Sequence, residues 1–423
     1  MSLFNKYKSK GSGYSIKQID LSVMPEGTPD ELKYLYEQTV VDRGEGYLGH
    51  PDSVLLKNGD ILTFFPKGHG KGAALSRRST DGGVTFIDGI KNPPKSWEGS
   101  RETPTVYRLE FNDPDTPDKL LLVCGNPKWG TEPTTGGFNC SLSCDEGETW
   151  SEFELFYKGM NTIVAMASLT RLKENGKFAD KWMALFHDRH FHNYKTILSF
   201  DKDGKMQWSK PEKYFTAYRG IEKGSNMCEV ECIRSDCGKG DELCLLTRSN
   251  TKKINSLITF SNDEGKTWSE PVELPAALNG ERHKADYLPD GRLIITFRSI
   301  ERDPKRNEIY KEKGHERRKW YSEGWIAWVG TYDDLRNGNE GQYRIKLAHT
   351  YLKHQKAPSL SANADTGYCG NVVLPDGTIM TSTYGKFSPD EMTENKKKLK
   401  TYIASKRINL RDTDALLKIL KTE

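Results

Sequence analysis

The chain alternates short apolar runs with tight polar turns, and this pattern predicts β-strands along most of its length. Three segments show it best: residues 55–65 read LLKNGDILTFF, residues 287–297 read YLPDGRLIITF and residues 373–382 read VLPDGTIMTS. Each places two apolar stretches around an Asn-Gly or Asp-Gly pair, which is typical of a β-hairpin. Helical periodicity is scarce. The best candidate is residues 28–40, because their Thr-Pro-Asp start is typical of a helix N-terminus.

A second pattern, Ser-x-Asp-x-Gly-x-Thr-aromatic, recurs along the chain. It reads STDGGVTF from Ser79, SCDEGETW from Ser143 and SNDEGKTW from Ser261, and a looser copy, SFDKDGKMQW, starts at Ser199. Each copy follows a β-rich stretch, so the unit is predicted to be strand, tight turn and strand. Asp and Gly supply the local hydrogen bonds and the positive φ of such a turn. The aromatic residue can pack between neighbouring sheets.

The spacing of these turns predicts the fold class. Repeats at a fixed period indicate a repeated supersecondary unit, and about 70 residues per unit over this length gives six sheets. We therefore predict an all-β fold, a six-bladed β-propeller of four-stranded antiparallel sheets. Two of the six units lack the turn pattern. We expect residues 1–423 to form one domain, with residues 1–40 as a lead-in whose segment 14–21 pairs with segment 401–410 to close the ring.

Composition narrows the classes of partner. The chain has 63 basic and 59 acidic residues, and its net charge is only +4. This balance favours a solvated surface and gives no reason to expect nucleic acid or a membrane as partner. The beginning of the sequence lacks the pattern of a signal peptide, and the eight cysteines include no C-x-x-C pair. We therefore expect a cytoplasmic protein with reduced thiols.

The repeated turn resembles the Asp box of the sialidase-like superfamily (neuraminidase, BNR or Asp-box repeat), with copies spread over residues 79–268. The resemblance implies a propeller with an axial carbohydrate pocket, whose Asp boxes lie on outer turns away from that pocket. Sialidases carry three arginines for the substrate carboxylate, an Asp acid/base, and a Tyr nucleophile activated by a Glu. A neutral phenol can attack an anionic sugar without like-charge repulsion.

Three segments resemble sialidase segments that carry functional residues. NMCEVECIRS resembles the segment of the activating glutamate and implies Glu229, with Glu231 on the same strand face as its rival. LCLLTRSN resembles the segment of the second arginine and implies Arg248, while TGYCGNVVLPDG resembles the nucleophile segment and implies Tyr368. The resemblance therefore makes Glu229 and Tyr368 candidate catalytic residues and Arg248 a candidate substrate-binding residue.

Elsewhere the chain departs from the sialidase pattern. LGHPDSVLL places His50 where the first arginine is expected, and PKGHGKGAALSRRS offers His69 and Lys71 in place of the acid/base Asp. WYSEGW places Ser322 and Glu323 near the third arginine position, and neither residue binds a carboxylate as arginine does. A hairpin could bring His50 and His69 to one end of the first blade. This pair resembles a branch of propeller lyases and atypical glycosidases, so both histidines are candidate catalytic residues.

Other polar residues stand where blades are predicted to begin, and loops at one end of a propeller converge on its axis. The candidate substrate-binding residues of this kind are Lys71, Arg101, Glu102, His187, Asp188, Arg282, His283 and Arg298. The spacing of His187, His190 and His192 leaves a zinc site as an alternative. No matching acidic or cysteine set flanks them, so we expect neither a metal nor a cofactor.

Together these features predict a glycosidase of the exo-α-sialidase-like type, acting on an acidic or modified sugar with an altered arginine triad. Arg248, with Arg101 or Arg298, would bind the substrate, Glu229 and Tyr368 would form a base-activated pair, and a histidine would protonate the leaving oxygen. One alternative is a uronic-acid lyase that uses the histidine pair and a tyrosine. Another is a glycan-binding propeller without catalysis. The sugar, its linkage, the anomeric outcome and the oligomeric state stay open.

Overall fold

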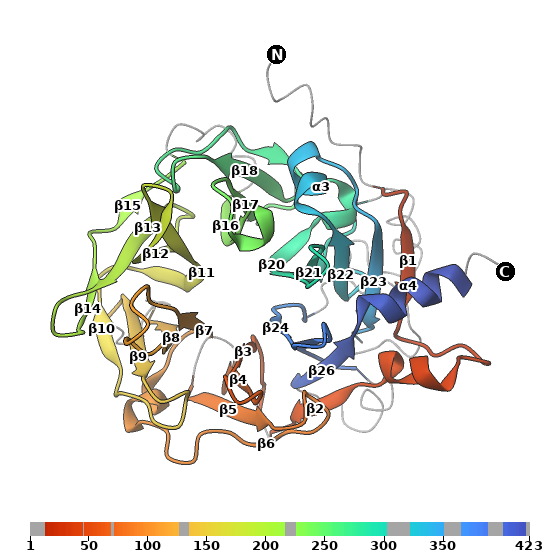
Figure 1. The fold of residues 1–423 in the computed structure, drawn as a ribbon, viewed down its shortest axis with the longest axis horizontal. Coiled ribbons are helices and arrows are strands. Elements are labelled where there is room, and N and C mark those ends of the chain that lie inside the picture. Colours follow the sequence, from red (N-terminus) through yellow and green to blue (C-terminus); the bar gives the residue numbers. More distant parts are fainter. Residues whose placement is uncertain are drawn as a thin grey trace.

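Six sheets of mainly antiparallel strands surround a central axis, so the chain is a six-bladed β-propeller (Figure 1). The fold class predicted from the sequence is confirmed. The structure is a computed structural model, and it describes residues 13–44, 46–68, 72–126, 135–215, 226–302, 322–350, 365–387 and 401–419. No helix within these ranges is both long enough and apolar enough to cross a membrane.

The first four blades follow one another along the chain, each beginning with the strand nearest the axis (Figure 1). Blade 1 comprises β3 (Asp52–Leu55), β4 (Ile61–Pro66), β5 (Ala74–Ser79) and β6 (Ile87–Asp88). Blade 2 comprises β7 (Pro104–Leu109), β8 (Lys119–Gly125), β9 (Phe138–Ser143) and β10 (Glu154–Phe156). Blade 3 comprises β11 (Thr162–Glu174), β12 (Lys177–Asp188), β13 (Asn193–Phe200), β14 (Met206–Trp208) and β15 (Glu212–Lys213). Blade 4 comprises β16 (Met227–Arg234), β17 (Leu243–Ser249), β18 (Leu257–Ser261) and β19 (Val272–Glu273).

The last two blades each recruit a strand from the N-terminal part of the chain. Blade 5 comprises β20 (Gly280–Tyr287), β21 (Leu293–Ser299), β22 (Trp325–Gly330), β23 (Tyr343–Ala348) and the early strand β1 (Lys17–Asp20). Blade 6 comprises β24 (Gly370–Val373), β25 (Ile379–Gly385), β26 (Tyr402–Ile408) and the early strand β2 (Thr39–Asp42). The hairpins predicted from the apolar pattern are β3–β4, β20–β21 and β24–β25, and all three are antiparallel.

The recurring Ser-x-Asp-x-Gly-x-Thr segments form the turns between the third and fourth strands of blades 1, 2 and 4. In blade 1 the Ser79 hydroxyl donates to Asp81 Oδ1 at 2.8 Å, and the same oxygen accepts the backbone N–H of Thr85 at 2.9 Å. The turns that begin at Ser143 and Ser261 repeat both bonds at the same distances. Each turn is therefore closed by its own side chains, as expected of an Asx-type turn.

The central glycine of each turn also packs against the preceding blade. A Cβ atom on Gly83 would lie 2.5 Å from Cγ of Met380 on β25, and one on Gly147 would lie 2.6 Å from Leu62 on β4. The glycine in the third turn, Gly265, would approach Met183 on β12 equally closely. All three glycines have positive φ. The turns therefore require glycine at this position for two reasons: its backbone has positive φ, and a side chain there would collide with the neighbouring blade.

The two units that lack the turn pattern connect their outer strands differently. In blade 5, the helix α3 (Tyr332–Asn337) links β22 to β23, with Thr331 and Asp334 forming a capping box at its start. In blade 6, no turn is needed after β26, because its outer neighbour β2 comes from the other end of the chain.

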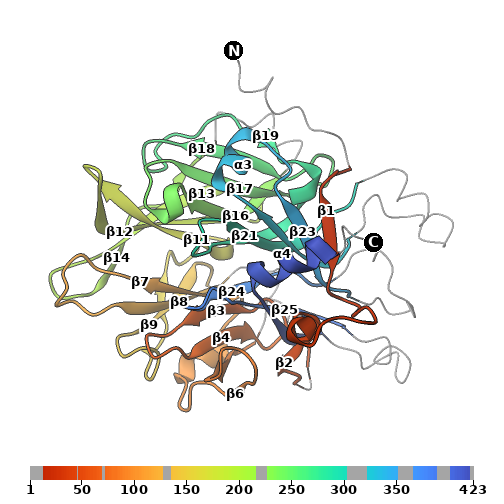
Figure 2. The ribbon, with the colours of Figure 1, turned by 45° about the vertical axis from the view of Figure 1, so that its right-hand side comes forward.

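The predicted pairing of segment 14–21 with segment 401–410 is wrong. β1 pairs in parallel with β23 of blade 5, and the strand that closes the ring on β26 is β2 (Figure 2). The predicted helix over 28–40 is a shorter 3-10 helix, Asp30–Tyr36, because the chain must become extended again to enter β2. The buried Lys406 amine donates to the carbonyls of Leu21, Leu35 and Tyr36, and so fixes this lead-in against β26.

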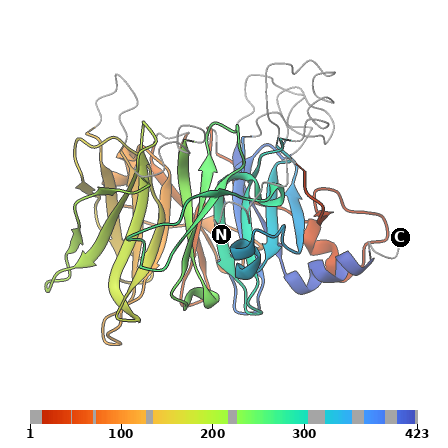
Figure 3. The ribbon, with the colours of Figure 1, turned by 90° about the horizontal axis from the view of Figure 1, so that it is seen from above.

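Apolar side chains fill the spaces between adjacent blades. Between blades 4 and 5, Leu246 and Ile258 pack with Ile295, Ile326 and Trp328, all of them nearly inaccessible to solvent. Strands run roughly along the axis when the ring is seen from the side (Figure 3). The starts of all the inner strands therefore meet at one end of the axis, where polar side chains can converge.

Candidate active site

The entry into several inner strands is bent by a residue with positive φ. Glu229 on β16 has φ of 49°, and Arg282 on β20 has φ of 57°. Each lies at a register shift in the pairing with the next strand. His50, which directly precedes blade 1, also has φ of 49°. Bulges of this kind re-aim side chains next to active sites, and each left-handed non-glycine residue costs about 1–3 kcal/mol.

Tyr368, Glu229 and Arg248 form a closely bonded trio from three separate parts of the chain. The Tyr368 hydroxyl donates to Glu229 Oε1 at 2.8 Å, and Arg248 Nη1 lies 2.7 Å from the same carboxylate oxygen. Arg248 Nη1 also lies 2.9 Å from the Tyr368 oxygen. Tyr368 and Glu229 are buried, and Arg248 is nearly so. The three residues that the sequence associates with glycosidase chemistry are thus brought together.

The protonation states of this trio follow from their surroundings. Burial raises the pKa of Glu229, but the Arg248 charge and the hydrogen bonds from Arg248 and Tyr368 outweigh it, so that pKa lies below its usual range. Burial and the Glu229 charge hold the pKa of Tyr368 well above its usual range. The resting pair is therefore a carboxylate that accepts the proton of a neutral phenol.

Glu281 and Lys252, which the sequence analysis missed, complete a charged cluster behind the trio. Glu281 Oε1 lies 2.9 Å from Arg248 Nη2 and 2.7 Å from Lys252 Nζ, while Glu281 Oε2 accepts from Arg298 Nε at 2.7 Å. Arg298 also lies over the Tyr368 ring, 5.6 Å from its centre. The candidate residue Arg298 therefore does reach the site. Glu281 directly precedes Arg282 and His283, but neither motif nor period distinguished it in the sequence.

His50 and His187 approach the trio from two other blades. The His50 ring lies 4.5 Å from the Tyr368 ring and 4.9 Å from the Tyr384 ring, centre to centre. His187 Nδ1 lies 2.9 Å from the backbone oxygen of Asp188, and burial lowers its pKa. A neutral imidazole whose Nδ1–H donates to a carbonyl carries its lone pair on Nε2. Within the described part of the chain, that Nε2 has no hydrogen-bond partner.

Two other candidates are held by hydrogen bonds to nearby parts of the chain. The Asp188 carboxylate accepts the backbone N–H groups of His190 and His192 and lies 2.9 Å from His192 Nδ1, so it closes a local turn. The buried His283 ring lies 2.9 Å from the carbonyl oxygen of Leu278. Both groups are used in holding the fold together. His283 also lines the narrow pocket that contains Tyr368, and the substrate-binding roles of both residues stay predictions.

Arg282 and Tyr368 line a narrow axial pocket beside the trio, together with Asp52, Thr103, Thr105 and Lys284. Arg282 donates to the carbonyl of Ala167 at 2.9 Å, and it has no carboxylate partner among the residues that the structure describes. The candidates Arg101 and Glu102 lie directly before β7, where blade 2 approaches the same pocket. Among the described residues, the Arg282 guanidinium therefore lines the pocket without a carboxylate at ion-pair distance.

Glu231, the rival of Glu229, points to a different environment. Its Oε1 accepts the backbone N–H of Ala285 on the next inner strand at 3.0 Å. Burial raises the pKa of Glu231 to about 7, although the charge of Lys284 opposes this. Asp52 makes the corresponding contact between blades 1 and 2, by accepting the N–H of Val106 at 3.0 Å. The Glu231 and Asp52 carboxylates each join two neighbouring inner strands, whereas the Glu229 carboxylate accepts the hydrogen bond from Tyr368.

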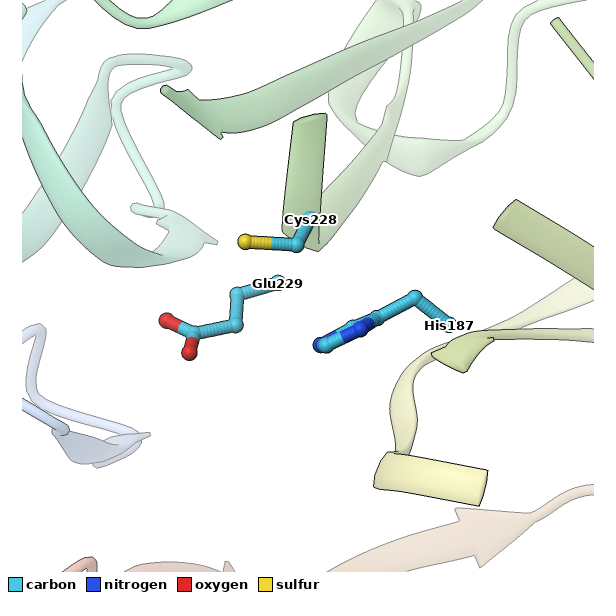
Figure 4. Close-up of side chains that lie close together, drawn as sticks. All are labelled: His187, Cys228 and Glu229. Carbon is cyan, nitrogen blue, oxygen red and sulfur yellow. The ribbon is translucent and has the colours of Figure 1, made fainter. Parts of the chain in front are cut away.

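Among the residues that the structure describes, one group of side chains could hold a metal ion. The ligand atoms of His187, Cys228 and Glu229 lie within 4.8 Å of one another, and all three residues are buried (Figure 4). This group differs from the set His187, His190 and His192 that the sequence spacing suggested, because His192 is bonded to Asp188. The Arg248 guanidinium, 2.7 Å from Glu229, opposes a divalent cation at the same carboxylate.

Two predicted residues cannot be placed. His69 and Lys71 lie outside the described residues. The bridge between Leu48 and Lys67 does join the two ends of the first hairpin near His50. At the third arginine position, Glu323 forms an ion pair with Arg344 at 3.1 Å, so its carboxylate is engaged within blade 5.

Comparison with known proteins agrees with this fold. A model of the BNR repeat-like domain family matches residues 100–319. An α-L-arabinanase from Penicillium chrysogenum, solved with arabinobiose, superposes with a TM-score of 0.55 at 13% identity, over 88% of this chain and 98% of its own. The α-L-arabinofuranosidase Arb93A from Fusarium graminearum superposes with a TM-score of 0.54 at 12% identity, over 88% of this chain and 98% of its own. An intramolecular trans-sialidase from Ruminococcus gnavus superposes with a TM-score of 0.50 at 12% identity, over 87% of this chain and 96% of its own. None of the curated proteins compared with the chain matches its sequence.

The chain therefore shares its six-bladed propeller fold with these solved structures. The chain belongs to the BNR repeat-like domain family, whose model matches more than half of its length.

Proposed function

We propose that the protein is a glycoside hydrolase in which Tyr368 is the nucleophile and Glu229 its general base. The observation that carries this proposal is the 2.8 Å hydrogen bond from the Tyr368 hydroxyl to Glu229 Oε1, supported by Arg248 at 2.7 Å from the same oxygen. A phenol is a weak nucleophile, and an adjacent carboxylate that takes its proton activates it. The likeness of the fold to arabinan- and sialic-acid-directed proteins also favours a carbohydrate substrate.

The proposed reaction proceeds in two steps. In the first, the Tyr368 oxygen bonds to the anomeric carbon, its proton passes to Glu229, and the glycosidic C–O bond breaks as the leaving oxygen gains a proton. In the second, water attacks the anomeric carbon and gives up a proton to the residue that protonated the leaving oxygen, while the Tyr368 oxygen leaves and recovers its own proton from Glu229. Two inversions at one carbon retain its configuration. Arg248 touches both partners and stabilises the negative charge that moves between Glu229 and Tyr368.

His50 is the described residue that we propose as the acid for the leaving oxygen, and His69 is the alternative from the sequence. The closeness of the His50 ring to the Tyr368 ring, 4.5 Å between centres, supports a role beside the nucleophile. General acid catalysis by a positioned imidazole typically contributes about 10²–10⁴-fold.

Elimination from a uronic acid is the second candidate. The observation that favours it is the same contact between His50 and Tyr368, because β-elimination needs one group that removes a proton and one that protonates the leaving oxygen. In that reaction a ring C–H proton is lost, the C–O bond to the leaving oxygen breaks, and a C=C bond forms without water.

Mass spectrometry of the products formed from a panel of oligosaccharides separates the two candidates. Hydrolysis gives products whose summed mass exceeds the substrate by one water. Elimination gives products that sum to the substrate mass and absorb in the ultraviolet. Tyr368→Phe is the control, since it must abolish turnover in either reaction. Turnover by Tyr368→Phe at the wild-type rate would contradict the assigned site.

A further inference from the structure

Glu281 lies where positive side chains gather behind Tyr368. It is 1% exposed, and its two carboxylate oxygens contact three cationic side chains. Arg248 Nη2 and Lys252 Nζ lie 2.9 Å and 2.7 Å from Oε1, while Nε and Nη2 of Arg298 both donate to Oε2. Two guanidinium groups and an ammonium group around one buried carboxylate form a carboxylate-binding site whose occupant belongs to the protein itself.

Glu281 is ionised in this setting. Burial raises its pKa, but the charges of Arg248, Arg298 and Lys252 outweigh burial and hold the pKa far below its usual range. The cluster therefore already contains an anion that belongs to the protein.

Both terminal nitrogens of Arg248 already contact groups of the protein itself. Nη1 contacts Glu229 and Tyr368, and Nη2 contacts Glu281. Arg298, which lies over the Tyr368 ring, donates a hydrogen bond from its guanidinium group to Glu281. A substrate carboxylate placed between Arg248 and Arg298 would lie beside Glu229 and Glu281, where like-charge repulsion opposes it.

We propose that Glu281 occupies the place of a substrate carboxylate, so that the reacting sugar carries hydrogen and not a carboxylate on its anomeric carbon. The inference rests on the proposed hydrolase function. It names the substrate class as an aldose glycoside and excludes glycosides of 2-keto acids such as sialic acid. Glu281 is then a positioning residue that sets specificity: it holds Arg248 and Arg298 against Tyr368 and repels a carboxylate from their midst.

The first test compares 4-methylumbelliferyl glycosides as substrates of the wild-type protein. The panel contains neutral aldosides, with α-L-arabinofuranoside among them, and the α-glycoside of N-acetylneuraminic acid. We expect release from an aldoside, with kcat/KM on the sialoside at least about 100-fold lower. Efficient release from the sialoside would overturn the inference and leave the hydrolase function standing. Release from no member, by protein shown to be folded, would count against the hydrolase function itself and so against the inference built on it.

The second test does not depend on finding the substrate. In Glu281→Ala, the carboxylate is lost but the three cations remain, so sodium acetate should fill the vacated space and raise Tm by about 2 °C or more over sodium chloride. Glu281→Gln is the matched control, because the amide keeps the volume filled and leaves no room for acetate. Neither acetate nor N-acetylneuraminic acid should raise the Tm of the wild type. Stabilisation of the wild type by N-acetylneuraminic acid, lost on Arg248→Met, would show that the arginines still bind a carboxylate and would overturn the inference.

Discussion

Tyr368 donates its phenolic hydrogen to Oε1 of Glu229 at 2.8 Å, although 139 residues separate the two in the chain. Arg248 contacts both at once, at 2.7 Å from the carboxylate and 2.9 Å from the phenol oxygen. A buried carboxylate is tolerated here because a guanidinium neutralises it, and a buried phenol is tolerated because its hydroxyl finds an acceptor. The same bonds that make these groups stable in the interior prepare them for proton transfer.

Tyr368→Phe removes the proposed nucleophile and changes the packing little. We expect kcat/KM to fall by about 10³-fold or more, because the covalent step has no substitute. Thermal unfolding should change by only a few degrees. Tyr34→Phe is the control, since it removes a 2.6 Å hydrogen bond to Asp412 that lies outside the site. Equal activity of the two variants, measured on one fluorogenic glycoside, would remove Tyr368 from the mechanism.

Glu229→Gln and Glu231→Gln distinguish the two carboxylates of β16. Of the two, Glu229 accepts the hydrogen bond from Tyr368, so replacing its carboxylate with an amide should lower kcat by about 10²–10⁴-fold. Glu231 has its pKa raised to about 7 by burial, against the opposing charge of Lys284, and its neutral form closely resembles glutamine. Glu231→Gln should therefore keep kcat within about threefold of the wild type. The reverse ranking in steady-state assays would exchange the roles of the two residues.

Gly83→Ala tests the contact between a turn and the neighbouring blade. Gly83 has φ of +88°, and an added Cβ would lie 2.5 Å from Met380 Cγ. Gly59 has φ of +91° but nothing within 4 Å of an added Cβ, so Gly59→Ala measures the backbone strain alone. We expect Gly83→Ala to lower the free energy of unfolding by at least about 1 kcal/mol more than Gly59→Ala. Urea unfolding of both variants gives the difference, and equal losses would mean that the blades do not meet there.

His283→Gln should reduce the sensitivity of the fold to acid. Burial lowers the pKa of His283 from 6.5 to about 4. Between these values the unfolded chain binds a proton that the folded chain does not, so stability is full above pH 6.5 and is lost as the pH falls towards 4. Glutamine keeps a donor for the Leu278 carbonyl and does not titrate. When the pH is lowered from 7 to 4.5, the free energy of unfolding, measured in urea, should fall by about 2–3 kcal/mol more in the wild type than in the variant. Parallel losses would place the acid-sensitive group elsewhere.

Lys406→Met should loosen the lead-in that closes the ring. The Lys406 amine donates to the carbonyls of Leu21, Leu35 and Tyr36 at 2.9, 3.1 and 3.2 Å, and methionine leaves all three without this donor. We expect a loss of about 1–3 kcal/mol in stability and faster hydrogen exchange over residues 17–42. Lys346→Met is the control, because its 3.4 Å ion pair with Asp20 is partly exposed and contributes about 0–1 kcal/mol. Unchanged exchange in Lys406→Met would show that β2 alone closes the ring.

Much of the architecture could be predicted because its determinants are local. Hairpin pairs such as β3–β4 follow from two apolar stretches around Asn-Gly or Asp-Gly, and the Ser79, Ser143 and Ser261 turns are closed by their own side chains. The ring closure could not be predicted in the same way. Segments 14–21 and 39–42 are both short and β-compatible, and only the full set of blades decides that β1 extends blade 5 while β2 completes blade 6.

The site was predicted in part, for a related reason. Glu229, Arg248 and Tyr368 stand in segments that resemble sialidase motifs, and the structure brings them within hydrogen-bonding distance, while their catalytic roles stay predictions. Glu281 and Lys252 carry no motif, and the two carboxylates of β16 look alike in the sequence. A bulge of the backbone directs Glu229 to Tyr368 and leaves Glu231 bonded to Ala285. A single-domain chain in the cytoplasm likewise stays a prediction.

The sequence by itself determined the period, the strands and the turns, because hydrophobic alternation and turn chemistry act over a few neighbouring residues. Only the tertiary structure decided which charges meet. Glu281 is bound by Arg248, Lys252 and Arg298, and Coulomb interactions in a buried site depend on distances that only the closed ring sets.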